Sequence, residues 1–177
     1  MNDNVKVSFK DGFRIMQLTD LHLVRTGDGP EQRELDMIRN LIALERPDFV
    51  AVTGDLSLSD TSDCCYRVFC DFMDGFGIPW AYAMGNDNGM LRAMQEKGDM
   101  RGVFVGHDHV NDFAGMYNGI LLAYGRGSCN GEQYIGGIKR GGYIYPGYIP
   151  GCRMIVLQRD GFETYVRLED GTLLYKD

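Results

Sequence analysis

The chain has 177 residues, 44% of them hydrophobic and 24% charged, which suits one globular domain spanning residues 1–177 and is too short for two. The formal net charge of −7, without a block of lysine or arginine, excludes nucleic acids and anionic membranes as favoured partners, because both would be repelled. No apolar run is long enough to cross a bilayer and the N-terminus has no signal-peptide core, so we expect a cytoplasmic protein, although an exported parent that has lost its leader would give the same pattern.

The first half of the chain alternates short apolar runs with segments in which apolar residues recur at helical spacing. In chain order, the pattern predicts a strand at 13–19, a helix at 31–46, a strand at 49–53, a helix at 60–74, a strand at 80–84, a helix at 89–97 and a strand at 102–105. Strands that alternate with helices form βαβ units. We therefore expect an α/β fold, classed as α+β in some schemes, with a largely parallel sheet.

The second half of the chain is predicted to consist of strands joined by tight turns. The expected strands are 120–124, 153–158, 162–168 and 172–175. Asp160-Gly161 and Asp170-Gly171 are strong signals for antiparallel hairpins. Residues 125–151 are rich in glycine and tyrosine, which predicts a long surface loop or an irregular hairpin.

Potential metal ligands follow each of the four strands predicted in the first half. In chain order they are Asp20 and His22, then Asp55, then Asn86 and Asp87, then His107, Asp108 and His109. Ligands of parallel α/β sheets bind beyond the carboxyl ends of the strands, so we expect these groups to meet at one edge of the sheet. All three histidines of the chain lie in these segments, which is hard to explain by isolated structural histidines.

The mixture of carboxylate, imidazole and amide groups suits manganese, iron, zinc or magnesium. Side chains two positions apart on an extended strand point the same way, so Asp20 with His22, and His107 with His109, can each act as a pair. Glycine precedes Asp55, Asn86 and His107, where it would let the backbone turn sharply and approach closely.

The five cysteines do not indicate a disulfide framework, because their number is odd and their spacing is not paired. They are Cys64, Cys65, Cys70, Cys129 and Cys152. A thiolate metal site would need a Cys-x-x-Cys pair or a nearby histidine, and the sequence indicates neither. The three cysteines of the predicted helix at 60–74 are expected to be small buried hydrophobes.

The ordered set of motifs resembles the signature of the calcineurin-like metallophosphoesterases. The matching segments are Asp20-Leu21-His22, Gly54-Asp55, Gly85-Asn86 and Gly106-His107-Asp108-His109. The runs 102–113, 124–127 and 153–168 are similar to the branch related to purple acid phosphatases. This resemblance covers nearly the whole chain and implies a β-sandwich flanked by helices that hydrolyses a small phosphoester or a phosphoprotein.

The resemblance also implies two adjacent sites for divalent metal ions. Asp20, His22, Asp55 and His109 would hold the first ion; Asp55 would bridge to a second, which Asn86 and His107 would also bind. Leu58 stands where purple acid phosphatases proper have a tyrosine, so the coloured iron–tyrosinate site is not expected.

Two departures from the family pattern predict a weakened second site. Asp87 lies where the family has its catalytic histidine, and a further histidine ligand of the second metal has no counterpart. The short interval from Asp87 to Gly106 implies an internal deletion of one strand and one helix, which would expose apolar surface and could favour a homo-oligomer. Asp87, Asp108 and Asp112 are the nearby carboxylates that could fill the gap, although a solvated aspartate is the more ordinary role for each.

The expected function is therefore metal-dependent phosphoester hydrolysis at a di-metal centre with an incomplete second site and reduced activity. One alternative is a metal-binding pseudo-phosphoesterase without catalysis, and a weaker one is a nuclease, which the acidic composition disfavours. Arg126 is a candidate phosphate clamp because arginine can bind phosphate through two hydrogen bonds, the alternative being an ordinary surface arginine.

Overall fold

The computed structural model describes residues 8–23, 25–26, 29–30, 32–56, 62–83, 101–117, 119–129, 133–135, 138–140 and 145–174. The predicted helix at 89–97 and the candidate ligands Asn86 and Asp87 lie outside these residues. Within the described part of the chain, no helix is long and apolar enough to span a membrane.

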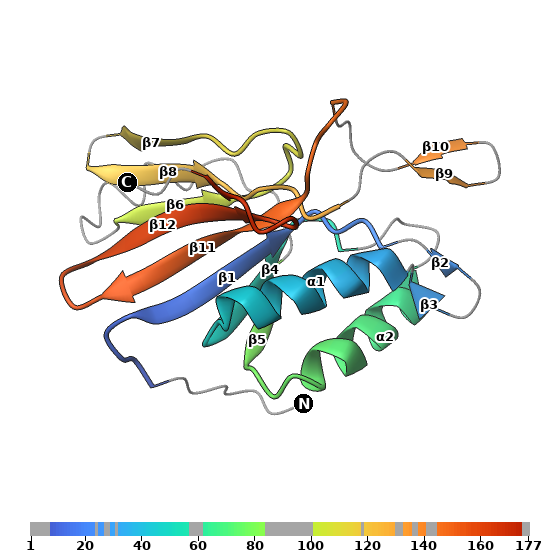
Figure 1. Ribbon diagram of the computed structural model, residues 1–177, viewed down its shortest axis with the longest axis horizontal. Coiled ribbons are helices and arrows are strands. Elements are labelled where there is room, and N and C mark those ends of the chain that lie inside the picture. Colours follow the sequence, from blue (N-terminus) through green and yellow to red (C-terminus); the bar gives the residue numbers. More distant parts are fainter. Residues whose placement is uncertain are drawn as a thin grey trace.

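A six-stranded mixed sheet forms the centre of the molecule (Figure 1). Its strands, in spatial order, are β13 (Leu173–Leu174), β12 (Gly161–Leu168), β11 (Gly151–Gln158), β1 (Phe13–Thr19), β4 (Phe49–Thr53) and β5 (Trp80–Ala83). Strands β1, β4 and β5 run parallel, whereas β11 is antiparallel to β1 and is followed by antiparallel hairpins. The βαβ first half and the hairpin second half are thus confirmed. The strands of the first half that join this sheet are parallel as predicted, and the sheet as a whole is mixed because the terminal hairpin adds antiparallel to the free edge of β1.

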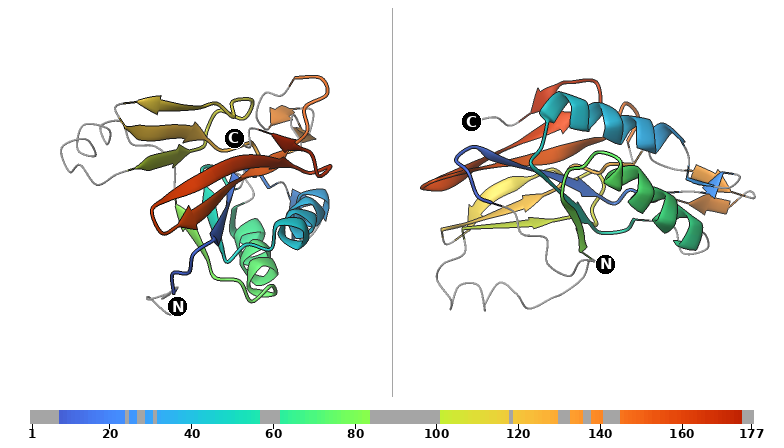
Figure 2. Two further views of the ribbon diagram at one scale, coloured as in Figure 1. Left: turned by 60° about the vertical axis from the view of Figure 1, so that its left-hand side comes forward. Right: turned by 90° about the horizontal axis from the view of Figure 1, so that it is seen from below.

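Two helices cover one face of this sheet, and a second sheet covers the other (Figure 2). The helices are α1 (Gln32–Glu45) and α2 (Ser62–Asp74), and the second sheet has the order β6 (Gly102–Val105), β8 (Ile120–Tyr124) and β7 (Ala114–Tyr117). The other described strands form two small hairpins, β2 (Arg25–Thr26) with β3 (Gly29–Pro30), and β9 (Gln133–Ile135) with β10 (Ile138–Arg140). The molecule is therefore a β-sandwich with helices on one outer face.

The helix-facing side of the large sheet holds the hydrophobic core. Met16 and Leu18 of β1 are fully buried there, as the two-residue period of a strand requires. The apolar stripe predicted for the first helix, including Ile38 and Leu41, packs against them. This burial fixes which side of β1 faces the helices, and hence the direction in which its carboxyl end points.

The opposite side of the large sheet is unusually polar where it meets the second sheet. Gln17, Thr19, Ser128 and Arg153 are all buried. Arg153 of β11 donates hydrogen bonds to the carbonyl oxygens of Tyr124 (2.6 Å) and Asp112 (2.7 Å), so it ties the two sheets together. One of these buried polar residues, Thr19, is the last residue of β1.

Two sequence expectations are corrected by this arrangement. The predicted strand at 102–105 exists as β6, but it pairs with β8 in the second sheet and not with the parallel strands of the first. The segment 125–151, expected to be a long surface loop or an irregular hairpin, contains the β9–β10 hairpin, but its first residues, 125–129, are buried: Gly127 forms a β-bridge with Thr19, and the amide of Ser128 donates to the Thr19 carbonyl at 2.9 Å. The loop thus continues the sheet beyond the end of β1.

Exposed apolar side chains gather on and beside strand β7. Phe113, Met116 and Tyr117 each have more than half of their surface exposed. They give the expected homo-oligomer a physical basis, and self-association stays a prediction.

Candidate metal centre

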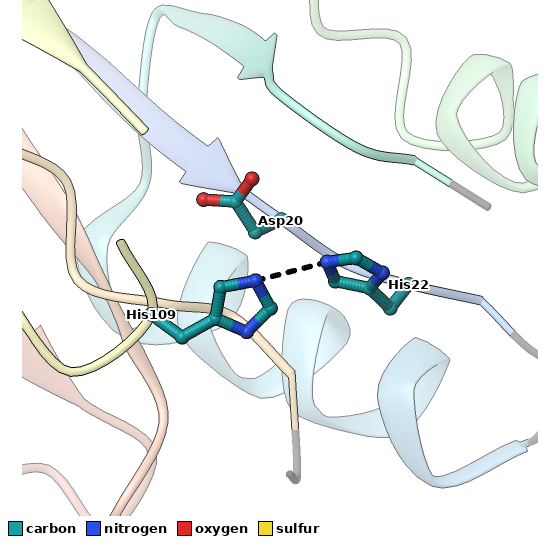
Figure 3. A group of neighbouring side chains, drawn as sticks. All are labelled: Asp20, His22 and His109. Atoms are coloured by element: carbon teal, nitrogen blue, oxygen red, sulfur yellow. Dashed lines mark hydrogen bonds between the residues drawn. The ribbon is translucent and has the colours of Figure 1, made fainter. Parts of the chain in front are cut away.

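Three side chains from two chain segments converge beyond the carboxyl end of β1 (Figure 3). Asp20 and His22 follow β1 directly, and His109 lies in the loop after β6. One ligand atom from each of the three lies within 4.8 Å of those of the other two. Although β6 belongs to the other sheet, its carboxyl end is brought to the same place, so three of the predicted ligands meet at the junction of the two sheets.

The two imidazoles face each other through their Nε2 atoms, which are 2.9 Å apart. Two nitrogen ligands that lie about 2.1 Å from one ion, at a right angle, would be separated by about 3.0 Å, so this spacing fits adjacent positions around a metal. In the absence of a cation, one ring must carry the hydrogen between them. Burial lowers the pKa of His22, and the neighbouring His109 lowers it further, which favours the neutral imidazole that metal binding requires.

The carboxylate of Asp20 is held by backbone amides from two other strand ends. Its Oδ2 accepts hydrogen bonds from the amide of His107 (2.6 Å) and the hydroxyl of Thr19 (2.9 Å), and its Oδ1 accepts one from the amide of Asp55 (3.3 Å). The side chain is buried, with 1% of its surface exposed. Asp20 is therefore a preorganised candidate ligand that also holds three chain segments together.

Two glycines make this close approach possible, as the sequence predicted. A Cβ at Gly54 would lie 2.3 Å from Oδ1 of Asp20, and one at Gly106 would lie 1.9 Å from Oγ1 of Thr19. Any side chain at either position would displace the carboxylate or the threonine. The backbone itself thus forms the wall of the site.

Three site residues have a left-handed backbone, which is uncommon for residues other than glycine. The φ angles are +53° at Asp20, +46° at His22 and +82° at His107. Such conformations cost free energy and cluster at functional sites. The strain coincides with the segments that the motifs single out.

The remaining predicted ligands are placed less tightly. Asp55 lies at the rim, with its side chain 66% exposed and its Oδ2 4.0 Å from Nε2 of His22. His107 is exposed, and its backbone amide, through its bond to Asp20, is the part that takes part in the site. Among the described residues the convergence is therefore a first site of three residues with Asp55 beside it; Asn86 and Asp87 fall outside the described chain.

Arg126 is neither an ordinary surface arginine nor placed as expected for a phosphate clamp. It is 4% exposed, and its Nη1 lies 2.8 Å from the carboxylate of Asp112. Its Nε and Nη2 donate to the carbonyl of Ile149, and its guanidinium stacks on the ring of Tyr148 at 4.0 Å. These contacts occupy the guanidinium within the fold and assign Arg126 a structural role.

A cysteine beside a histidine was not foreseen from the sequence. The sulfur of Cys129 lies 3.3 Å from Nδ1 of His109, on the ring edge opposite Nε2. The hydroxyl of Tyr148 also donates to the carbonyl of His109 at 2.7 Å. Both partners come from the glycine-rich segment 125–151, and nothing in their spacing relative to His109 signals the contact.

Comparison with known proteins finds a family model for the first half of the chain and relatives that match short stretches. A model of the calcineurin-like phosphoesterase family matches residues 13–88, which include Asp20, His22 and Asp55. Two Arabidopsis thaliana proteins, probable inactive purple acid phosphatases 29 and 14, are 47% identical over 45 residues and 40% identical over 55 residues. The matches cover 25% and 30% of this chain but 12% and 14% of the relatives, so the chain spans a small part of their length.

Two solved structures share the fold over nearly the whole chain. A conserved protein from Streptococcus pneumoniae TIGR4, described as a predicted phosphoesterase, has a TM-score of 0.55 at 12% identity and 95% coverage of both chains. Chaetomium thermophilum Vps29 has a TM-score of 0.57 at 13% identity and 93% coverage of both chains. At this identity the likeness concerns the fold, and it extends to the second half of the chain.

Proposed function

Because this chain belongs to the calcineurin-like phosphoesterase family, we propose that Asp20, His22 and His109 bind a divalent metal ion and that phosphoesters are hydrolysed there. The observation that carries the proposal is the convergence of these three side chains at one end of β1. Manganese, iron, zinc and magnesium all suit a set of one carboxylate and two imidazoles.

Each residue around the proposed ion has a separate proposed role in binding it. Asp20 is fixed by amides from two other loops, and both imidazoles present Nε2 toward the same point. Asp55, exposed beside His22, is proposed to complete the first site and to bridge to a second, for which Asn86 and His107 remain the proposed ligands. When bound, a divalent ion would polarise the phosphoryl group and neutralise its charge.

Hydrolysis is proposed to be slow. Asp87 replaces the histidine that the family uses near the leaving group, and general acid help of that kind is worth about a hundredfold to ten-thousandfold in rate. A small phosphoester or a phosphoprotein is the proposed substrate. The acidic composition, with a net charge of −7, continues to disfavour nucleic acid.

A second candidate is a metal-binding protein of the same family without catalysis. Its support is that the curated relatives are named as probable inactive phosphatases, together with the departures at the second site. It predicts bound metal without turnover, whereas the leading proposal predicts bound metal with turnover.

The experiment combines metal titration by calorimetry with hydrolysis of an aryl phosphate in the presence of Mn²⁺. Wild-type protein is compared with Asp20→Asn and Asp55→Asn, and with Asp36→Asn as the matched control, because Asp36 is an exposed aspartate on α1. Metal binding lost in Asp20→Asn and kept in Asp36→Asn supports the site. Hydrolysis that neither site variant reduces would contradict the catalytic proposal, and hydrolysis absent from wild type that still binds Mn²⁺ favours the second candidate.

A further inference from the structure

His109 is contacted on both edges of its ring. Nε2 faces His22 at the proposed metal site, and Nδ1 lies 3.3 Å from the sulfur of Cys129. Cys129 is 2% exposed, so this contact is shielded from water. A buried polar contact on the far side of a metal-binding imidazole is the position from which the ring's tautomer is controlled.

We propose that Cys129 is a positioning residue that sets the tautomer and orientation of His109 for metal binding, an inference that rests on the metal site proposed above. A neutral imidazole carries one hydrogen, and a ring that binds a cation through Nε2 must carry that hydrogen on Nδ1. Nδ1–H then needs an acceptor, and the Cys129 sulfur is the atom placed to receive it.

The same sulfur can also serve the metal-free protein. A thiol is a weak donor as well as a weak acceptor, so S–H can donate to Nδ1 while Nε2–H of His109 donates to Nε2 of His22. The contact is therefore kept in both states, with the hydrogen on opposite ring nitrogens. An apolar side chain at this position could support neither state.

The segment that carries Cys129 is held rigidly. Ser128 donates its amide to the Thr19 carbonyl at 2.9 Å and its hydroxyl to the Gly151 carbonyl at 2.7 Å. Tyr148 donates to the His109 carbonyl at 2.7 Å, and burial raises the pKa of Tyr148, which keeps its hydroxyl protonated for that bond. Ring and backbone of His109 are thus both fixed from the segment 125–151, as a preorganised ligand requires.

Cys129 is not itself placed as a ligand of the proposed ion. Its sulfur approaches Nδ1, whereas the three converging groups meet at Nε2 of the same ring. The inference therefore concerns the support of a ligand, and support of this kind typically changes metal affinity by about 10–100-fold.

The test compares three substitutions of one buried residue with a control. Cys129→Ser keeps a donor and acceptor, Cys129→Val fills the space without either, and Cys129→Ala empties it. Cys152→Ala is the control, because Cys152 is equally buried but belongs to the core beneath the helices. Circular dichroism verifies the fold of each variant, and the Ser and Val variants keep the comparison valid if the Ala variant does not fold.

Two measurements are made on each protein, Mn²⁺ affinity by calorimetry and the side-chain ¹⁵N shifts of His109 by NMR without metal. We expect Cys129→Val and Cys129→Ala to weaken Mn²⁺ binding by about 10–100-fold, Cys129→Ser to stay within a few-fold of wild type, and Cys152→Ala to match it. We also expect the His109 ring shifts to change in the Val variant and to be largely restored in the Ser variant.

The two measurements separate this inference from the metal-site proposal. Wild-type Mn²⁺ affinity together with unchanged His109 shifts in Cys129→Val would overturn the role of Cys129. If wild-type protein bound no Mn²⁺, the metal-site proposal would fail, and the His109 shifts alone would decide whether Cys129 controls the ring. A Ser variant as impaired as the Val variant would also overturn the inference, because it would make packing the cause.

Discussion

Three residues of the candidate metal centre adopt a backbone conformation that glycine would adopt at lower cost. Asp20, His22 and His107 all have φ angles between +46° and +82°. Holding a residue with a Cβ there costs on the order of 1 kcal/mol. Placing these side chains therefore lowers the stability of the fold. The cost can be measured at His107, because its side chain is exposed and packs least.

His107→Gly is expected to raise the free energy of unfolding by up to about 1 kcal/mol, because glycine relieves the strain at φ +82° while only an exposed imidazole is lost. Urea denaturation checks the change. His107→Ala is the control, since it removes the same imidazole but retains the Cβ. Equal stabilisation by both variants would show that the backbone conformation is not the source.

Gly106→Ala is expected to destabilise the fold by about 1–3 kcal/mol and to weaken metal binding, because its methyl group would overlap Thr19 and crowd the Asp20 carboxylate. Gly161→Ala is the matched control, since a Cβ there meets nothing within 4 Å and the backbone has no positive φ. Thermal unfolding and Mn²⁺ titration of both proteins provide the comparison. A Gly106→Ala protein as stable as the Gly161→Ala protein would contradict the close approach described here.

For single residues, the sequence predicts the local backbone role better than it predicts which distant side chains come into contact. The glycines before Asp55 and His107 were assigned to close backbone approach, and the structure confirms that approach. The burial of Arg126 and the contact between Cys129 and His109 were missed. Both involve residues of the segment 125–129, which the bridge between Gly127 and Thr19 places beside the end of β1, and no periodicity in the sequence indicates that contact.

Most elements of the first half follow from periodicity, but their assembly into sheets does not. The predicted strands at 13–19 and 49–53 match β1 and β4, and the predicted helices at 31–46 and 60–74 match α1 and α2 within two residues at each end. Strand β6 was predicted but assigned to the wrong sheet. An apolar run indicates a buried strand but does not indicate which strand it pairs with. The strand that pairs with β6 is β8, which comes later in the chain.

The C-terminal end of α1 is anchored to the sheet through the buried carboxylate of Glu45. It accepts hydrogen bonds from the guanidinium groups of Arg14 on β1 and Arg167 on β12, and from the hydroxyl of Tyr165 at 2.6 Å. Burial raises the pKa of Tyr165, and the bond to Glu45 raises it further, so the hydroxyl remains a donor. The network fixes the position of the helix over β1.

Glu45→Gln is expected to lower the free energy of unfolding by about 3 kcal/mol, because it leaves two arginines without their buried counter-charge. Guanidinium chloride is avoided because its ionic strength screens charges, and urea denaturation is the measurement. Glu163→Gln is the control, since Glu163 is an exposed glutamate on β12. A loss no larger than the control would contradict the anchoring role of Glu45.

At the scale of the whole molecule, the two sheets meet through hydrogen bonds as well as apolar contacts. Arg153 is fully buried and reaches from the large sheet to the backbone at the end of β8 and at Asp112. The loop that carries His109 connects β6 to β7 in the second sheet and contains one of these two anchor points, Asp112. The relative position of the sheets therefore determines whether His109 meets Asp20 and His22.

Arg153→Met is expected to lower the free energy of unfolding by about 3 kcal/mol, because two partly buried carbonyl groups lose the same buried donor while the side-chain volume is nearly kept. It is also expected to weaken Mn²⁺ binding, since the two sheets would lose the hydrogen bonds that fix their relative position. Arg159→Met, at an exposed hairpin turn, is the control. Mn²⁺ affinity is measured under conditions where unfolding experiments show that Arg153→Met is fully folded, and we expect weaker binding there. Unchanged Mn²⁺ affinity of the folded variant would mean that Arg153 contributes to stability alone.

The position of β11 beside β1 limits what a shortened chain could do. The region that matches the family ends at residue 88, whereas β1 is paired with β11 along Phe13 to Gln17, and His109 also lies beyond that boundary. A recombinant fragment ending there would retain the recognisable aspartates and His22, yet it would turn the central strand into an unprotected edge and lack the third ligand. The region matched by the family model therefore lacks both the neighbour strand of β1 and the His109 of the proposed metal site.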